Sequence, residues 1–423
     1  MAPAGRGRLP SPNQVGYGAV LRLAAFRPLY AATVLARTGG QMQTVVVVLF
    51  ALRRFHSPEL AGLTVLAQLP GIVLSPVSGA LLDRHHRIRL ITLDYLIAGG
   101  SLALIGVLAL RGALPALALV AIFSVAGLTS PLSWAGTKSL FPTVVPKRLW
   151  DRANGLDSAA YVVATILGPG LAGILVALLG ESWAMVANAV VYAAAIGSVV
   201  MVRVAAPPTE PRRGLFRDAR AGLGYVLHHP TLRGLAVGMS LTSIGWGVLT
   251  IGLPVLVLHH LRAGPAAVGW LWGLSGATGL VAGLLVGRLG TDGRERLVLS
   301  LGIGVVAGGT LVVALSSSLG MAAVGMLVIG AGGGPFDVAL FSLRQRRTER
   351  TWFGRAFAIS MSLNYIGTPI GAALGGPLVA ASAPVALVLA AAVTLAAWPV
   401  VRGLVPGEPR RPRGPVPLKA PLL

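Results

Sequence analysis

Four ionisable side chains lie inside long apolar runs of the sequence: Arg37, Asp94, Asp157 and Asp337. An ionisable group costs about 2.5–3.5 kcal/mol at the centre of a membrane helix, so such residues usually serve ion pathways or proton relays. A buried carboxylate holds its proton firmly and one beside a cation releases it, so alternating surroundings can load and unload a proton. Arg37 and Asp337 lie about two turns inside their runs, roughly 10 Å at about 1.5 Å per residue, and are the stronger candidates.

The composition indicates which elements must position these residues. Of the 423 residues, 55% are hydrophobic and 11% charged, whereas soluble domains are about one-quarter charged. Gly and Pro are spread through the apolar segments, which suits helices packed in lipid. We therefore predict an all-α integral membrane protein. The sequence contains no Cys, which excludes disulfides, thiolate nucleophiles and thiolate metal sites.

Apolar windows of about 20 residues, enough to cross the hydrocarbon core, stand between charges or Pro/Gly turns. Twelve are expected, at residues 31–52, 58–82, 90–110, 113–139, 153–179, 182–202, 232–259, 266–289, 297–317, 320–343, 353–379 and 383–401. Of the 35 Lys and Arg residues, Arg37 lies in a window and Arg53, Arg54, Arg111 and Arg262 lie in alternate loops. All others share one side with both termini, which the positive-inside rule places in the cytoplasm.

The sequence also carries an internal repeat. "GALLDR" at 79–84 aligns with "GLLVGR" at 283–288, an offset of 204 residues, and Pro131 meets Pro335 at the same offset. Two pseudo-symmetric six-helix halves of parallel topology are therefore predicted. The expected divisions are a basic cytoplasmic N-tail (1–27), an N-terminal half (28–203), a cytoplasmic linker (204–230), a C-terminal half (231–403) and a Pro/Arg-rich C-tail (404–423).

Within the linker, Leu215, Ala219, Leu223 and Val226 recur at helical spacing. This pattern predicts an amphipathic helix that either lies on the inner leaflet, attracted by anionic headgroups, or is solvated. Both alternatives stay open.

The basic loop "SGALLDRHHRIRLI" at 78–91 carries a motif whose main positions are Gly79, Asp83, Arg84, Arg87 and Arg89. With the two predicted halves, it resembles signature A of the major facilitator superfamily, although His86 replaces a Gly and Ile88 replaces a base. The resemblance covers nearly the whole chain. It implies that Asp83 and the arginines form a cytoplasmic latch, with the acid beside the start of the helix expected near residues 353–355. Alternatively, Asp83 caps a turn and the arginines only fix topology.

A second motif lies in "GLDSAAYVVATILGPGLAG" at 155–173. Gly155, Gly168, Pro169 and Gly173 match signature C, which is found mainly in the superfamily's proton-coupled drug antiporters, while Ala164 and Ala172 replace glycines. Pro169 frees a carbonyl group, and small residues let another helix approach closely. Ordinary small-residue packing would produce the same pattern.

The segments "RANGLDSAAY" and "LARTGG" are similar to a branch of bacterial exporters that includes siderophore and macrolide exporters. That branch commonly has an Asp where this chain has Gln41. Glutamine does not titrate, so any proton site must lie elsewhere.

The superfamily's architecture implies that spans 1, 4, 7 and 10 line a central cavity. The resulting pathway candidates are Arg37, Gln41, Trp134, Lys138, Trp246 and Asp337. One hypothesis is that Asp337 pairs with Arg37 or Lys138 when the cytoplasmic side is closed and that protonation loosens the pair. The equal alternative is a permanent, bracing ion pair. Asp94 and Asp157 lie about a turn inside cytoplasmic ends and are expected to pair structurally near the latch.

Together these features predict a multi-pass protein of the bacterial inner (plasma) membrane that moves small amphipathic molecules by alternating access, as an efflux system driven by proton antiport. An uptake permease of the same fold and a transport-inert membrane protein are the alternatives. An embedded enzyme is disfavoured, because all seven His residues fall in loops or at span ends. The expected partners of the transporter are the lipid bilayer, a small-molecule substrate and protons. No cofactor, metal, ATP or nucleic acid is expected.

Overall fold

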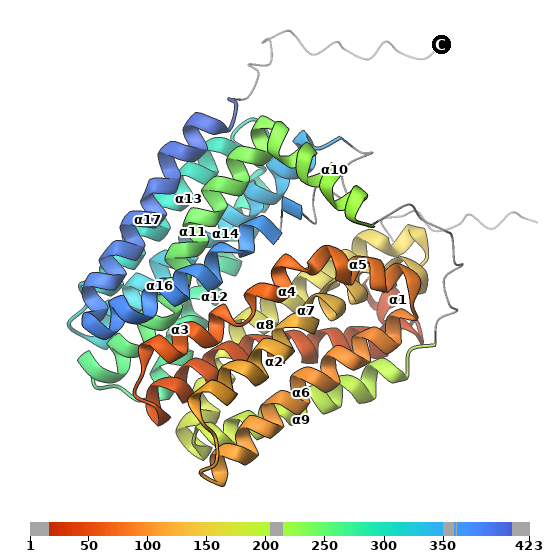
Figure 1. Cartoon of the computed structure of the whole chain (residues 1–423). Helices are drawn as coiled ribbons and strands as arrows, with labels where there is room; N and C mark the ends of the chain where they lie inside the picture. Colours follow the sequence, from red (N-terminus) through yellow and green to blue (C-terminus); the bar gives the residue numbers. More distant parts are fainter. Residues whose placement is uncertain (1–16, 204–214, 350–358, 361, 408–423) are drawn as a thin grey trace, which may run out of the picture.

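A computed structural model describes residues 17–203, 215–349, 359–360 and 362–407, and these form a helical protein (Figure 1). The N-terminal part contains α1 (Tyr17–Leu21), α2 (Phe26–Arg54), α3 (Pro58–Leu66), α4 (Leu69–Val73), α5 (Ser75–Arg84), α6 (Arg87–Leu110), α7 (Ala116–Val144), α8 (Trp150–Leu179) and α9 (Glu181–Val200). The linker contains α10 (Leu215–His228). The C-terminal part contains α11 (Pro230–Val255), α12 (Pro265–Leu289), α13 (Glu295–Ala314), α14 (Leu319–Arg347), α16 (Gly367–Ala381) and α17 (Ala383–Leu404).

Among the described residues, ten helices are long and apolar enough to cross a membrane, and each corresponds to one predicted window. The second window, residues 58–82, is instead divided into α3, α4 and α5. The interruptions lie just before Pro70 and Pro76, which are in the first turns of α4 and α5. Proline interrupts a helix because it lacks an N–H group and its ring clashes with the preceding turn. In the eleventh window the structure describes α16 and a few residues before it, and the predicted start at 353–355 lies outside the described residues.

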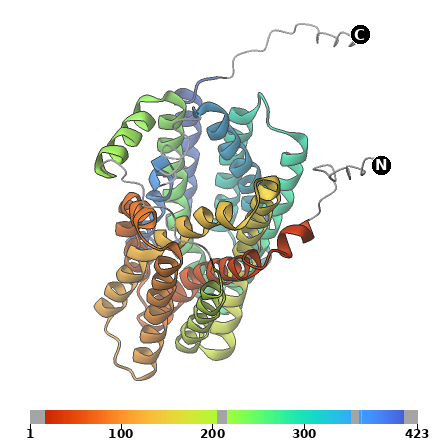
Figure 2. The same cartoon turned by 90° about the vertical axis from the view of Figure 1, so that its right-hand side faces the viewer.

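The packing of one half is repeated in the other. In the N-terminal half α2 contacts α8 and α9, and α6 contacts α7 and α9. In the C-terminal half α11 contacts α16 and α17, and α13 contacts α14 and α17. These sets correspond helix by helix, in agreement with the internal repeat, and the two halves lie side by side (Figures 1 and 2).

The halves pack tightly at one end, which we call the seam end. There α3 contacts α16, and α8 contacts α12. The approach is close: a Cβ built on Gly62 would lie 2.4 Å from the carbonyl oxygen of Ala372, and one on Gly269 would lie 2.3 Å from that of Pro169. Glycine is needed at both positions because the opposing backbones leave no room for a side chain.

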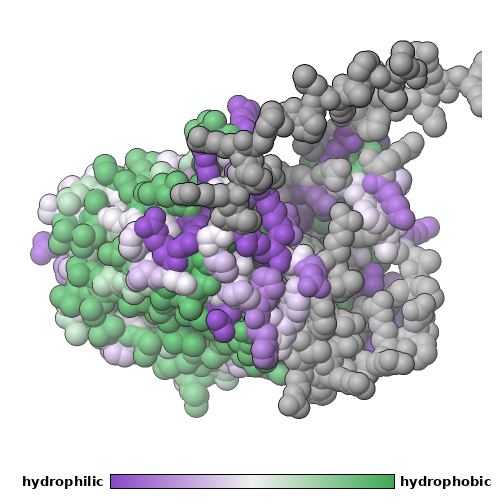
Figure 3. Space-filling view, turned by 90° about the horizontal axis from the view of Figure 1, so that it is seen from above, coloured by the Kyte–Doolittle hydropathy of each residue, from purple (hydrophilic) through white to green (hydrophobic). Residues whose placement is uncertain are grey.

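The opposite end, which we call the basic end, carries the loops with most of the arginines. Hydrophilic side chains gather on this face and hydrophobic ones cover a flank (Figure 3). The linker helix α10 lies here and contacts α11 and α5. The linker helix expected from the sequence corresponds to α10. Val226 is buried against Leu232, Ile359 and Leu363, whereas Leu223 is exposed. The location of α10 on a lipid leaflet stays a prediction.

Candidate functional site: charges and aromatic rings between the two halves

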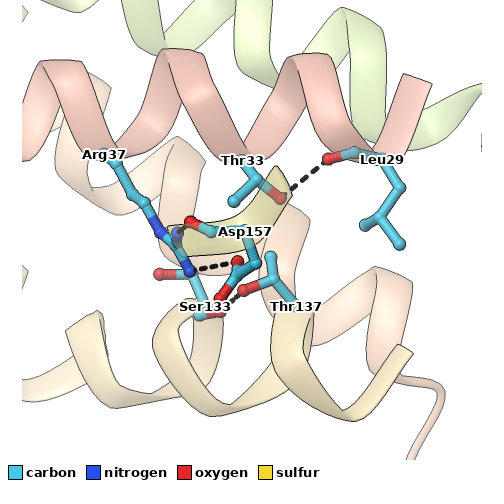
Figure 4. A network of polar contacts seen from close by, with 6 residues as sticks. All are labelled: Leu29, Thr33, Arg37, Ser133, Thr137 and Asp157. Atoms are coloured by element: carbon cyan, nitrogen blue, oxygen red, sulfur yellow. Dashed lines mark hydrogen bonds and ion pairs between the residues drawn. The ribbon is translucent and has the colours of Figure 1, made fainter. Parts of the chain in front are cut away.

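Arg37 on α2 forms an ion pair with Asp157 on α8 (Figure 4). The guanidinium Nη2 lies 2.6 Å from Asp157 Oδ1, and Nη1 donates a hydrogen bond of 2.7 Å to the main-chain oxygen of Asp157. The side chains are only 10% and 13% exposed. The cation therefore binds both the side chain and the backbone of its partner, which fixes α2 against α8 within the N-terminal half.

Aromatic side chains extend from this pair toward the other half. Trp134 lies one turn before Lys138 on α7, and the Nζ atom of Lys138 is 5.7 Å from the centroid of the Trp134 ring. Trp134 makes edge contacts with Tyr161 on α8, at 6.2 Å between centroids, and with Tyr365 of the C-terminal half, at 6.4 Å. Trp134 and Tyr365 remain 45% and 40% exposed although they face each other from opposite halves. They therefore border accessible space between the halves.

Asp337 on α14 borders the same space from the C-terminal half. Its side chain is exposed and lies within electrostatic range of Tyr161 and Tyr365. In the described part of the chain Asp337 makes no ion pair, and Arg37 is engaged by Asp157. The hypothesised pairing of Asp337 with Arg37 or Lys138 concerned a different state, closed at the basic end, and stays a prediction.

Asp94 on α6 is enclosed within the N-terminal half. It is 3% exposed, its neighbours include Ser133 and Thr129 of α7, and its Oδ1 has no hydrogen-bond partner among the described residues. Asp157 pairs with the span residue Arg37, and the association of Asp94 and Asp157 with the latch stays a prediction.

The small residues of the second motif lie at helix contacts. A Cβ on Gly168 would lie 2.5 Å from Gln41 Cβ, so this glycine brings α8 against α2. A Cβ on Gly173 would lie 2.7 Å from the oxygen of Pro265, which places this glycine in the contact between the halves. Pro169 is inside α8, which continues through it. A Cβ on Gly155 would lie 3.3 Å from the ring of Tyr17 on α1.

The basic-loop motif spans the end of α5 and the start of α6. Arg87 donates to the main-chain oxygen of Ser139 on α7 at 3.1 Å, and Arg84 and Arg89 are exposed. Gly79 is in α5, with open space where a Cβ would be. The side chain of Asp83 and the start of the eleventh window lie outside the described residues, so the latch stays a prediction.

Trp246 on α11 is 40% exposed and contacts the ring of Trp272 on α12 at 5.0 Å between centroids. Sequence reasoning did not identify Trp272, Tyr161 or Tyr365. Helical spacing could have found Tyr161, because Asp157 and Tyr161 are four residues apart and so share one face of α8. Tyr365 carried no comparable signal, since its window contains no charge near it.

Comparison with known proteins identifies the family. Residues 16–405 match the model of the transmembrane secretion effectors. The chain belongs to this family of major facilitator transporters. The MFS-type transporter y4rN of Sinorhizobium fredii is 39% identical to it over 89% of this chain and 94% of that protein. The multidrug efflux pump Tap of Mycobacterium tuberculosis is 25% identical over 88% and 90%, and the enterobactin exporter EntS of Shigella boydii is 26% identical over 92% and 93%.

The transporter's fold also matches solved structures. The nucleoside transporter NupG, as its D323A mutant, superposes with a TM-score of 0.73 at 9% identity, over 90% of this chain and 99% of that one. The protein is thus a multi-pass membrane transporter of the major facilitator fold, with bacterial relatives that include efflux pumps, and it is not an enzyme.

Proposed function

We propose that this transporter exports small amphipathic organic molecules from the cytoplasm in exchange for protons. The observation that carries the proposal is the set of exposed aromatic rings between the halves, formed by Trp134, Tyr161 and Tyr365, with Lys138 and Asp337 beside it. Aromatic walls with a few polar groups bind molecules that combine apolar surface with a charge. Two exporters among the relatives support the direction of transport.

The arrangement of the halves supports alternating access. The halves are packed together at the seam end, and the aromatic rings between them remain accessible. Under the positive-inside rule the basic end faces the cytoplasm. Transport would then require the seam end to open as the basic end closes, with the substrate held between the rings of the two halves.

Proton coupling is assigned to Asp337 because it is the described acid that borders this space without a cation partner. When the basic end closes, α14 moves toward the N-terminal half, where Arg37 and Lys138 stabilise a carboxylate and so release its proton. Asp157 would be the resting partner of Arg37 in the state described here.

Counterflow in proteoliposomes tests the substrate class. Purified transporter is reconstituted into proteoliposomes, which are loaded in turn with lipophilic cations, macrolides and siderophores. Exchange is measured with and without an imposed pH gradient. We expect exchange of at least one amphipathic class and a gradient-dependent increase in its accumulation. Sugars and small anions are included for comparison, and exchange limited to them would contradict the proposal, whereas binding without any flux would identify a transport-inert protein.

The coupling residue is tested with Asp337→Asn. We expect this variant to retain substrate counterflow but to lose transport driven by a pH gradient, because an amide cannot carry a titrating proton. The control is Glu349→Gln, which neutralises an exposed acid just beyond the same helix. Unchanged substrate-driven proton flux in Asp337→Asn would eliminate Asp337 as the coupling residue.

A further inference from the structure

A groove of about 780 Å³ lies on the N-terminal half where the first turns of α6 meet the end of α9. Its lining consists of His86, Ile88, Arg89, Thr92, Leu93, Leu96, Val200, Val202 and Arg203. The two helices are antiparallel neighbours, because Gly99 lies against Tyr192 and, two turns further along α6, Gly106 lies against Val186. The groove is therefore at the basic end of this helix pair and not in the space between the halves.

The lining separates into two chemical zones. Arg89 and Arg203 are exposed, and His86 is half-buried with no hydrogen-bond partner for Nδ1 among the described residues. Deeper along the helices Leu93, Leu96 and Val200 are 46%, 54% and 54% exposed. None of the described residues that line the groove is acidic. Such a groove complements an amphipathic anion. Its charged head would lie beside the cationic groups at the helix ends, and its apolar tail would lie along the apolar wall.

The C-terminal half repeats this arrangement. A second groove, of about 390 Å³, is lined by Arg296, Leu297, Arg402 and Gly407, at the start of α13 and the end of α17. These helices are the repeat equivalents of α6 and α9. Here the arginines are partly engaged, since Arg296 donates to the main-chain oxygen of Arg402 and Arg402 lies 4.7 Å from the ring centroid of Trp398.

We propose that the α6–α9 groove binds an anionic phospholipid, with its phosphodiester headgroup on Arg89 and Arg203 and an acyl chain along Leu93 and Leu96. Basic pockets between membrane helices at the cytoplasmic side are suited to such headgroups. The α13–α17 groove is a weaker site of the same type, because its volume is smaller and its arginines already have partners. The lipid would anchor the outer helices of each half to one leaflet while the halves move.

The test compares two lipids that share acyl chains and differ in headgroup. The full chain, purified in detergent, is incubated with equal amounts of dioleoyl phosphatidylglycerol and dioleoyl phosphatidylcholine, and native mass spectrometry measures the ratio of the two lipids bound. We expect the wild-type protein to favour phosphatidylglycerol. In the Arg89→Gln/Arg203→Gln variant that preference is expected to fall by about tenfold, since each basic residue near a headgroup contributes to binding.

The matched control is Arg54→Gln/Arg111→Gln, which removes two exposed charges from the seam end and is expected to keep the preference. An equal loss in both variants would overturn the proposal, because it would show a dependence on net charge alone. A second variant, Leu96→Gln, keeps the charges and is expected to weaken retention of phosphatidylglycerol. If inorganic phosphate displaces the lipid and Leu96→Gln has no effect, the groove is a site for soluble anions and the proposal is wrong.

Discussion

At the scale of single residues, Arg37 and Asp157 form an ion pair in which both charged side chains are almost buried. We predict that Arg37→Gln or Asp157→Asn alone destabilises the protein by about 3 kcal/mol, because a buried charge left without its partner is costly. The double variant should lose less than the sum of the two, since it removes both charges. The measurement is the thermal unfolding midpoint of all three variants in one detergent.

Arg54→Gln provides the control for that comparison, because Arg54 is an exposed arginine at the end of the same helix and should leave the midpoint unchanged. Strictly additive effects of the two single variants would show that neither charge depends on the other. A double variant as unstable as that sum would therefore contradict the ion pair's structural role.

The partner of Arg37 could not be chosen from the sequence. Asp157 and Asp337 are both acids inside apolar runs, and depth along a helix favoured Asp337. The partner of Arg37 depends on which helix lies beside α2. In the structure this helix is α8, where Gly168 packs against Gln41, and these two residues are far apart in the sequence. Composition and charge spacing identified the four intramembrane charges, whereas their pairing is a property of the tertiary structure.

At the scale of elements, the contact of α8 with α12 depends on Gly269, whose position leaves no room for a side chain beside Pro169. We predict that Gly269→Leu forces the seam apart. Overpacking typically costs about 1–3 kcal/mol, which shifts a two-state equilibrium by roughly 5- to 150-fold. Transport should therefore fall at least severalfold while the protein still elutes as a folded species. Counterflow and size-exclusion chromatography provide the two measurements.

Gly170→Ala is the matched control, because Gly170 is adjacent to Pro169 and a Cβ there would meet nothing within 4 Å. It should transport at the wild-type rate. Normal transport by Gly269→Leu would show that the seam tolerates the added side chain and would contradict its role in closing the seam end.

The elements themselves were largely predictable, because a membrane helix needs a long apolar run and charges mark its ends. Ten windows correspond to continuous helices of suitable length. The second window differs because Pro70 and Pro76 interrupt its hydrogen-bond ladder, an effect that hydropathy does not register. The prolines were visible in the sequence. Whether each one bends a helix, as Pro169 allows in α8, or ends it depends on the neighbouring helices.

At the scale of the whole molecule, the two halves are packed together at the seam end. Transport by alternating access therefore requires a second state, in which the seam end is open and the basic end is closed. The absence of cysteine from the sequence allows spin labels to be placed without background. One pair, Thr143→Cys with Gln345→Cys, reports on the basic ends of α7 and α14. The other pair, Leu117→Cys with Gly320→Cys, reports on their seam ends, and all four positions are exposed.

We predict opposite distance changes for these pairs when a substrate identified by counterflow is added or the pH is changed. The basic-end distance should shorten and the seam-end distance should lengthen, because two rigid halves that rock about a central site move apart at one end as they meet at the other. Double electron-electron resonance measures both distances in the same lipid. Changes of the same sign at both ends would indicate separation of the halves without alternating access, and would refute the exchange of states on which the proposed export depends.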